Sequence, residues 1–174
     1  MNPEHRDSYP TFLVAAAGPA AAGLYDNVEV PGGPRGDSGT DLRFAEDAAI
    51  PPASLSQGLA TVVDLKVRIR CRLADGTYAP YFIAPRSSLG KTPLSLANGL
   101  GTIDAGYQGC LKVALRNHSE APWRVARGDA LFQLIRPDLT PVRVAVVSEG
   151  HDAFAEETAR AAGGFGSTGA GGAR

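Results

Sequence analysis

The stretch "VDLKVRIRCRL" at residues 63–73 decides the fold class, because its apolar and charged side chains alternate without a break. Alternation with a period of two predicts a half-buried β-strand, with one face on a hydrophobic core and the other in water. The next residues, "ADGTY" at 74–78, contain an Asp-Gly pair that favours a tight hairpin turn into a second strand over residues 78–83. The sequence therefore predicts an antiparallel hairpin here.

Further short apolar runs, each bounded by Gly, Pro, Asn or Asp, predict more strands. They cover residues 111–115, 123–125, 131–135 and 142–147. Short strands at this spacing are typical of an all-β antiparallel sandwich or barrel. Only residues 151–162 have the pattern of a helix, with an irregular arm as the alternative. Residues 1–36 show no clean periodicity, and we expect an irregular lead-in there.

The composition limits the class of protein further. A chain of 174 residues can form one domain with a sizeable core. Its net charge of -1 offers no broad basic surface, so we expect no nucleic-acid partner. The two cysteines, Cys71 and Cys110, have neither CxxC nor Cys/His spacing, which indicates buried thiols rather than a disulfide framework or a zinc site.

The apolar stretch at residues 9–24 is the only one that resembles a targeting or membrane segment. Acidic residues precede it and two prolines interrupt it, so it lacks the basic start and continuous apolar run of a signal peptide. It is also too short to span a bilayer. We therefore expect a soluble, intracellular protein without a membrane partner.

Two glycine-rich motifs resemble nucleotide-binding fingerprints. "GFGSTG" at 164–169 satisfies GxGxxG, but only five residues follow it, so we expect no Rossmann unit. "GKT" at 90–92 resembles the end of a P-loop, but Pro85 stands where that loop needs a glycine. Both turns still offer backbone N–H groups that could hold phosphate oxygens.

Four other segments place reactive side chains beside predicted strands. They are "SGTDL" at 38–42, "PRSSLG" at 85–90, "GTIDAGYQG" at 101–109 and "GDALFQLI" at 128–135. Taken one at a time, each has a structural interpretation: Asp41 could cap a turn, Arg86 could form a surface ion pair, Tyr107 could belong to the core, and Gln133 could be a satisfied buried amide.

Taken in order, and with "RAAGGFGSTG" at 160–169, these segments resemble the five motifs of the trimeric dUTPase (deoxyuridine triphosphate nucleotidohydrolase) family. Those motifs are usually written AGYDL, PRSGL, GxIDxxYxG, GxRxAQL and RGxGGFGSTG. The resemblance implies an all-β, dUTPase-like β jelly roll (β-clip) of antiparallel strands that assembles as a homotrimer with shared active sites. It divides the chain into a lead-in (1–36), a β domain (37–150) and a C-terminal arm (151–174) with a glycine-rich lid.

The resemblance also implies a reaction. Water would attack the α-phosphorus of dUTP to give dUMP and pyrophosphate, lowering dUTP and supplying dUMP for thymidylate synthesis. Asp104 would orient and deprotonate that water, and Arg160 would add positive charge in the manner of an arginine finger. Mg²⁺ would chelate the triphosphate, with Asp41 reaching the ion through water.

Further residues would bind the substrate. By resemblance, the phosphate contacts are Arg86, Ser87, Ser88, Gln133, Ser167 and Thr168. The uracil and deoxyribose contacts are Asn98, Gly99, Thr102, Ile103, Tyr107 and Phe165. Tyr107 would lie under the deoxyribose and leave no space for a 2′-hydroxyl, while Phe165 would stack on uracil.

The chain departs from the family motifs at several positions. Thr40 replaces the usual Tyr, Ser88 and Ala161 replace Gly, Ala130 replaces Arg, and Gly106 stands where many members have Asp. None of these departures removes Asp104, Tyr107, Arg86 or Phe165, so we still expect the activity. The alternatives are a structural virion protein and a non-catalytic or regulatory protein with this fold, whose mark would be the loss of Asp104 or Arg160, and both are present. A dCTP deaminase is less favoured, because it needs a catalytic Glu and lacks the closing glycine-rich motif.

Overall fold

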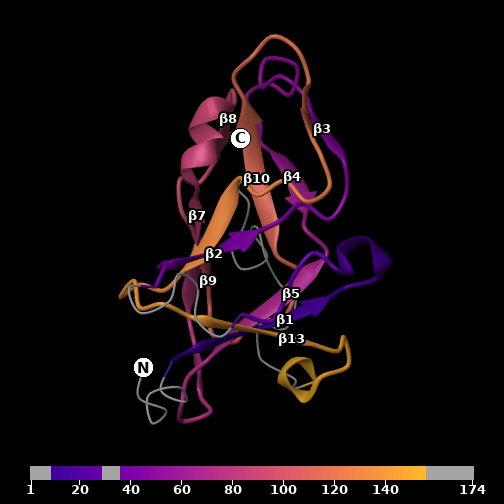
Figure 1. Ribbon diagram of the computed structural model, residues 1–174. Helices are drawn as coiled ribbons and strands as arrows, with labels where there is room; N and C mark the ends of the chain where they lie inside the picture. Colours follow the sequence, from indigo (N-terminus) through magenta and orange to yellow (C-terminus); the bar gives the residue numbers. More distant parts are fainter. Residues whose placement is uncertain (1–8, 29–35, 156–174) are drawn as a thin grey trace, which may run out of the picture.

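The computed structural model describes residues 9–28 and 36–155, and within them the chain forms short strands arranged in four sheets (Figure 1). In chain order the strands are β1 (Thr11–Ala16), β2 (Gly39–Leu42), β3 (Ala48–Ile50), β4 (Thr61–Asp64), β5 (Val67–Arg72), β6 (Tyr78–Ala79), β7 (Tyr81–Pro85), β8 (Leu94–Leu96), β9 (Gly101–Ile103), β10 (Lys112–Asn117), β11 (Trp123–Val125), β12 (Phe132–Ile135) and β13 (Arg143–Val147). Three 3₁₀ turns accompany them: η2 (Pro19–Ala21), η4 (Ser87–Lys91) and η5 (Asp152–Phe154).

The sheets have the orders β13-β1-β5-β6, β4-β10-β8, β11-β3 and β2-β12-β7-β9. In Figure 1, β1, β5 and β13 lie together in the lower part, β4, β8 and β10 lie in the upper part, and β2, β7 and β9 lie between them. Neighbouring strands pair antiparallel except β1 and β13, which are parallel. The all-β fold class predicted from the sequence is confirmed.

The alternating stretch at 63–73 is not one strand but two. β4 pairs with β10 and β5 pairs with β1 and β6, so the chain passes from one sheet to another between them. At the passage Lys66 has φ +53°, and its N–H donates to the Asp64 carboxylate at 2.8 Å. An Asp side chain that accepts from the backbone two residues on makes a local turn, which interrupts the ladder without disturbing the alternation.

The expected hairpin turn at Asp75-Gly76 is confirmed. Gly76 has φ +87° and its N–H donates to the Leu73 carbonyl at 3.0 Å, while Thr77 donates to the Asp75 carboxylate. The strand expected after it is again two, because β6 and β7 flank Pro80 and belong to different sheets. Proline has no N–H for a ladder hydrogen bond, which explains the break.

The lead-in expected over residues 1–36 contains a strand, which corrects that expectation for residues 11–16. β1 lies inside its sheet between β13 and β5, and its inner residues Phe12, Leu13, Val14 and Ala15 are all buried. A strand covered on both faces has a continuous apolar sequence rather than an alternating one. For this reason periodicity did not reveal it.

Hydrophobic side chains pack on both faces of this sheet. The larger cluster holds Phe12 and Val14, and Phe12 meets the Tyr81 ring edge-on with centroids 5.2 Å apart. The smaller cluster holds Leu13, Ala15 and, from η5, Ala153 and Phe154. The C-terminal end of the described chain therefore covers the outer face of the sheet.

The helix expected at 151–162 is not present as far as the structure describes it. Up to residue 155 the chain forms only the 3₁₀ turn η5, and the remaining positions lie outside the described residues.

Two burial expectations are also corrected. The charged positions of β5 were expected in water, but Arg70 is only 4% exposed because the smaller cluster covers it. Cys71 is buried as expected, whereas Cys110 is only half-buried.

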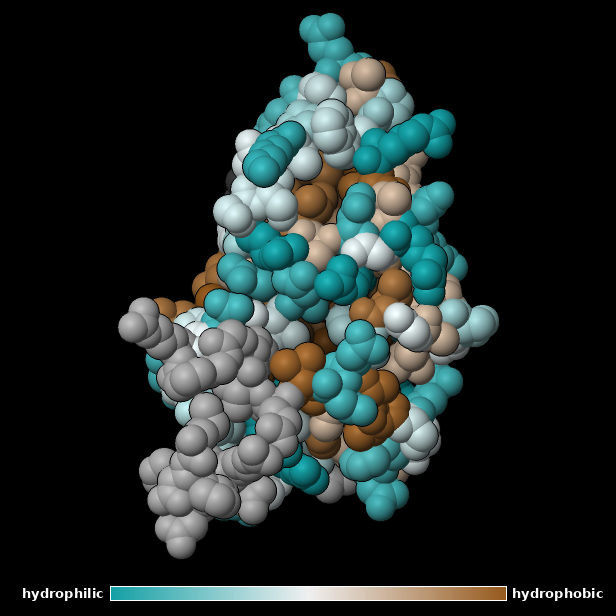
Figure 2. Space-filling model, viewed as in Figure 1, coloured by the Kyte–Doolittle hydropathy of each residue, from teal (hydrophilic) through white to brown (hydrophobic). Residues whose placement is uncertain are grey.

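On the face shown in Figure 2, hydrophilic side chains surround several separate hydrophobic patches. Large hydrophobic side chains that are exposed in the described residues include Val62, Leu100 and Trp123. Within residues 9–28 and 36–155, no helical turn is long and apolar enough to cross a membrane.

Candidate active site

The predicted metal contact Asp41 and the described phosphate contacts lie on or directly after three neighbouring strands. Asp41 on β2 stands opposite Gln133 on β12, and Gln133 stands opposite Ala84 on β7. Arg86 follows β7 directly and begins the turn η4, which contains Ser87 and Ser88. The sheet order β2-β12-β7 thus brings three separate sequence motifs together.

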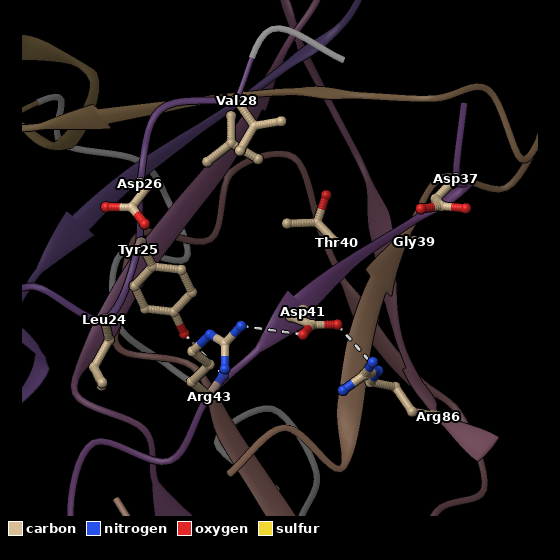
Figure 3. Close-up of a pocket in the computed structure, with 11 residues that line it drawn as sticks. Leu24, Tyr25, Asp26, Val28, Asp37, Gly39, Thr40, Asp41, Arg43 and Arg86 are labelled. Atoms are coloured by element: carbon tan, nitrogen blue, oxygen red, sulfur yellow. Dashed lines mark hydrogen bonds and ion pairs between the residues drawn. The ribbon is translucent and has the colours of Figure 1, made fainter. Parts of the chain in front are cut away.

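The centre of this group is an ion-pair cluster around Asp41 (Figure 3). One carboxylate oxygen lies 3.0 Å from Nε of Arg86 and the other 3.2 Å from Nη2 of Arg43. Backbone carbonyls hold both guanidinium groups further: Arg86 donates to Ala130 at 2.8 Å and Arg43 to Gly128 at 3.0 Å. The two cations are therefore oriented without a bound anion.

The departures from the family motifs are accommodated locally. Ser88 donates its hydroxyl to the Ala130 carbonyl at 3.0 Å, the same acceptor that Arg86 uses. The extra side chain at Ser88 thus strengthens the contact between the two motifs.

Gln133, which the motifs retain, is also held in place. Its amide donates to the Pro85 carbonyl at 3.2 Å, which holds its side chain beside Arg86.

A pocket of about 390 Å³ opens beside this cluster. Its walls include Thr40, Asp41, Arg43 and Arg86, and one side comes from the lead-in, where Tyr25 is prominent (Figure 3). Thr40, which replaces the larger Tyr of the first motif, faces this space.

Sequence reasoning missed Tyr25 and Arg43. The Tyr25 hydroxyl accepts from the Arg43 N–H at 3.0 Å, and burial raises the pKa of this tyrosine to about 12. Arg43 could have been found, because it stands two residues after Asp41 and alternate residues of an extended chain share a face. Tyr25 had no such signal, because it lies in a stretch without periodicity.

The described base and sugar contacts form a second group, in the loop that joins β8 to β9 and on β9 itself. β8 and β9 lie in different sheets and do not pair with each other. Asn98 and Gly99 occupy the exposed loop, where Gly99 has φ +67°, a conformation that favours glycine. Thr102 and Ile103 pair with Phe82 and Tyr81 of β7, which places β9 in the same sheet as β2, β12 and β7.

Asp104 comes directly after β9, at the start of a tight turn. The Tyr107 N–H donates to the Asp104 carbonyl at 3.0 Å, and the Tyr107 hydroxyl donates to the Cys110 carbonyl at 2.8 Å. Burial raises the pKa of Tyr107, so its hydroxyl stays protonated and keeps that bond to a more alkaline pH than an ordinary tyrosine would. The Tyr107 ring packs partly against the larger hydrophobic cluster, and this packing holds the ring in place.

Asp104 and Arg86 lie at opposite ends of β7, although Gly99 of the second group lines one pocket with Arg86 and Ser87. Ile103, just before Asp104, pairs with Tyr81, whereas Arg86 follows Pro85 at the other end. The five residue steps from Tyr81 to Arg86 separate these ends by about 17 Å, given a rise of about 3.3 Å per residue. One copy of the chain therefore does not bring Asp104 to its own Arg86. The predicted contacts Arg160, Phe165, Ser167 and Thr168 lie outside the described residues.

These features define a class: an all-β protein with paired arginines around Asp41 near one edge strand of a sheet and a turn that carries Asp104 after its other edge strand. The chain belongs to the dUTPase family, since the sequence model of that family matches residues 29–169. This match confirms the family resemblance seen in the ordered motifs.

Curated relatives agree with the assignment. The deoxyuridine 5′-triphosphate nucleotidohydrolase of Thermobifida fusca is 41% identical over 136 residues, covering 77% of this chain and 68% of the relative. That of Yarrowia lipolytica is 41% identical and covers 76% of each chain. The Arabidopsis thaliana enzyme is 38% identical, and the match covers 73% of this chain and 80% of the relative.

Solved structures show the same fold. The dUTPase of Staphylococcus bacteriophage 80alpha aligns with a TM-score of 0.52 at 18% identity, covering 71% of this chain and 87% of that one. A mutant dUTPase from phage phi11 of S. aureus, described with a structural Mg(II) ion, aligns with a TM-score of 0.52 at 19% identity, covering 71% of this chain and 88% of that one.

Proposed function

We propose that this protein hydrolyses dUTP to dUMP and pyrophosphate, which lowers dUTP and supplies dUMP for thymidylate synthesis. The observation that carries the proposal is the family match over residues 29–169, which includes all five motifs. Curated relatives named deoxyuridine 5′-triphosphate nucleotidohydrolase support the substrate.

In the proposed reaction Asp104 accepts a proton from water as the water oxygen bonds to the α-phosphorus. The bond from that phosphorus to the oxygen bridging to the β-phosphate breaks, and pyrophosphate leaves. A carboxylate serves as general base when it lies within hydrogen-bond reach of the nucleophile. Asp104 suits this role because the turn that carries it is closed by the Tyr107 N–H.

The phosphate chain would bind to Arg86, Ser87, Ser88 and Gln133. A guanidinium group suits two phosphate oxygens at once, and the Ala130 carbonyl already holds Arg86 in place. We assign Arg43 to the same anion site, because both arginines flank one carboxylate.

In the loop before β9 and on β9 itself, Asn98, Gly99, Thr102 and Ile103 would contact uracil. Tyr107 would lie under the deoxyribose, where a ring fixed by the core and by Cys110 excludes a 2′-hydroxyl. Discrimination against UTP would thus depend on the rigid placement of this ring.

Mg²⁺ would enter with the triphosphate and shift negative charge off the phosphorus. Among residues 9–28 and 36–155, no three His, Cys, Asp or Glu side chains gather to hold a metal ion directly. Both oxygens of Asp41 face guanidinium groups, so this carboxylate fits a contact through water rather than a direct one. Mg²⁺ commonly keeps several waters and binds substrate phosphates, which agrees with this donor set.

We further propose a homotrimer in which sites are shared between copies. The separation of Asp104 and Arg86 along β7 supports this, because a complete site then needs the Asp104 turn of one copy beside the anion site of another. Residues 151–174 would act as an arm that closes over such a site, with Arg160, Ser167 and Thr168 on the phosphates and Phe165 on uracil.

The test is pyrophosphate release from dUTP, dCTP, dTTP and UTP with Mg²⁺ present. We expect turnover of dUTP far above the other three, and loss of turnover in Asp104→Asn with nucleotide binding largely kept. Equal turnover of the four nucleotides would refute the assignment. Binding of dUTP without any turnover by the unmodified protein would favour the regulatory alternative, and release of ammonia from dCTP would indicate a deaminase.

A further inference from the structure

Arg70 on β5 is a buried cation outside the binding groups described above. It is only 4% exposed and lies beside the smaller hydrophobic cluster, which contains Leu13, Ala15, Ala153 and Phe154. Its guanidinium carbon lies 3.3 Å from the centroid of the Tyr78 ring, a cation–π contact. Burying an arginine is costly unless its donors find acceptors, because the group stays charged at all physiological pH values.

The acceptors come from two distant segments of the chain. Nη1 donates to the Ala153 carbonyl in η5 at 2.6 Å, and Nη2 lies 3.4 Å from the Ala105 carbonyl. Ala105 directly follows Asp104 and lies inside the turn that the Tyr107 N–H closes. One buried side chain therefore contacts both the turn that carries Asp104 and the segment that leads into residues 156–174.

An apolar side chain at this position would pack against the smaller hydrophobic cluster without needing hydrogen-bond acceptors. Leu13, Ala15 and Phe154 already fill this side of the sheet, and replacing a buried charged group by an apolar one is often neutral or stabilising. The arginine makes contacts that a leucine could not, namely the bonds to the two carbonyls. These bonds indicate a task other than filling space.

We propose that Arg70 is a positioning residue for the hydrolytic reaction: it fixes the Ala105 carbonyl and thereby the placement of the Asp104 carboxylate. The inference rests on the proposed role of Asp104 as general base. Arg70 lies in the hydrophobic cluster behind the turn and belongs to neither binding group, so its loss lowers kcat and leaves KM nearly unchanged. A base displaced by about 1 Å costs up to about a hundredfold in rate.

Arg68 provides a matched control on the same strand and face. Its guanidinium carbon lies 4.8 Å from the centroid of the Phe154 ring, and it donates to the Glu149 carbonyl. It therefore shares with Arg70 a cation–π contact and a bond to the C-terminal segment. The contact with the Ala105 carbonyl belongs to Arg70.

The experiment compares Arg70→Gln, Arg70→Lys and Arg68→Gln in the full-length protein with dUTP as substrate. We expect Arg70→Gln to lower kcat about tenfold to a hundredfold with KM within about twofold. Arg70→Lys keeps the charge and reaches one carbonyl, so we expect partial recovery. Arg68→Gln should lower the melting temperature to a similar degree while keeping kcat.

Equal kcat values for Arg70→Gln and Arg68→Gln would overturn the proposal. If Arg70→Gln does not fold, Arg70→Lys against Arg68→Lys decides, because only the former should lose kcat. Asp104→Asn is measured in parallel. Retained turnover in Asp104→Asn refutes the proposed base itself, whereas an inactive Asp104→Asn beside a fully active Arg70→Gln refutes only the positioning role.

Discussion

Gly39 controls the space in which Gln133 lies. A methyl group on Gly39 would lie 2.0 Å from Oε1 of Gln133 and 2.8 Å from its Cδ, which are impossible contacts. The backbone of Gly39 is ordinary for any residue, so the glycine is needed for space and not for conformation. The first motif thus determines where the amide of the fourth motif can lie.

Gly39→Ala should therefore displace the Gln133 amide and break its bond to the Pro85 carbonyl. Losing one phosphate contact of ordinary strength should raise KM for dUTP about threefold to tenfold. The free energy of unfolding should change by less than about 1 kcal/mol, because a flexible side-chain end can move aside. Steady-state kinetics and urea denaturation measure the two effects. Gly150→Ala, where a methyl group meets nothing within 4 Å, should change neither. An unchanged KM would show that Gln133 does not contact substrate.

β1 is the strand on which both hydrophobic clusters depend. Its alternate side chains point to opposite faces, so Phe12 and Val14 enter the larger cluster while Leu13 and Ala15 enter the smaller one. Removing any of these side chains leaves a cavity inside the sheet packing. The segment is therefore an integral part of the fold rather than a lead-in.

Phe12→Ala should lower the free energy of unfolding by about 3–5 kcal/mol, since Phe12 is fully buried against Tyr81. The exposed Val146 on β13 provides the control, and Val146→Ala should cost less than about 1 kcal/mol. Both are measured by urea denaturation at one fixed protein concentration. A loss below about 1 kcal/mol for Phe12→Ala would mean that β1 packs only loosely.

Local patterns predicted part of this fold. Bounded apolar runs located β11 and, to within a residue or two, β12 and β13, because those strands differ from their flanks in sequence. The breaks at Lys66 and Pro80 were missed, since they depend on which sheet each half joins. β1 was missed because burial on both faces leaves no period to detect.

The sequence predicted some residues of the candidate site and missed others, because local patterns do not show which strands pair. Ordered motifs singled out Asp41, Arg86 and Gln133, and strand pairing brings them together. The distance between Arg86 and Asp104 could not be predicted, because it follows from β9 pairing with the far end of β7. Arg70 carried no signal either, since its place in the alternation indicated an exposed position.

The assembly of copies can be tested by mixing two inactive variants. Arg86→Gln lacks the anion site and Asp104→Asn lacks the base, but copies of each in one trimer would combine an intact Arg86 with an intact Asp104. If chains mix at random, about a quarter of the sites should regain activity after the variants are unfolded and refolded together. Pyrophosphate release measures this recovery.

Refolding each variant alone provides the control and should give no activity. No recovery in the mixture would show that each site is built from one chain. A sedimentation mass near the 18.0 kDa of a single chain would also contradict shared sites.

The parallel pairing of β1 with β13 has a consequence for synthesis in the cell. β1 is translated first and β13 last among the described strands, so one edge of β1 has no partner on the ribosome until residues 143–147 have emerged. Pairings between such distant segments slow folding. An unpaired apolar edge also invites association with other chains. Nascent chains of this protein should therefore need protection from aggregation until β13 has emerged.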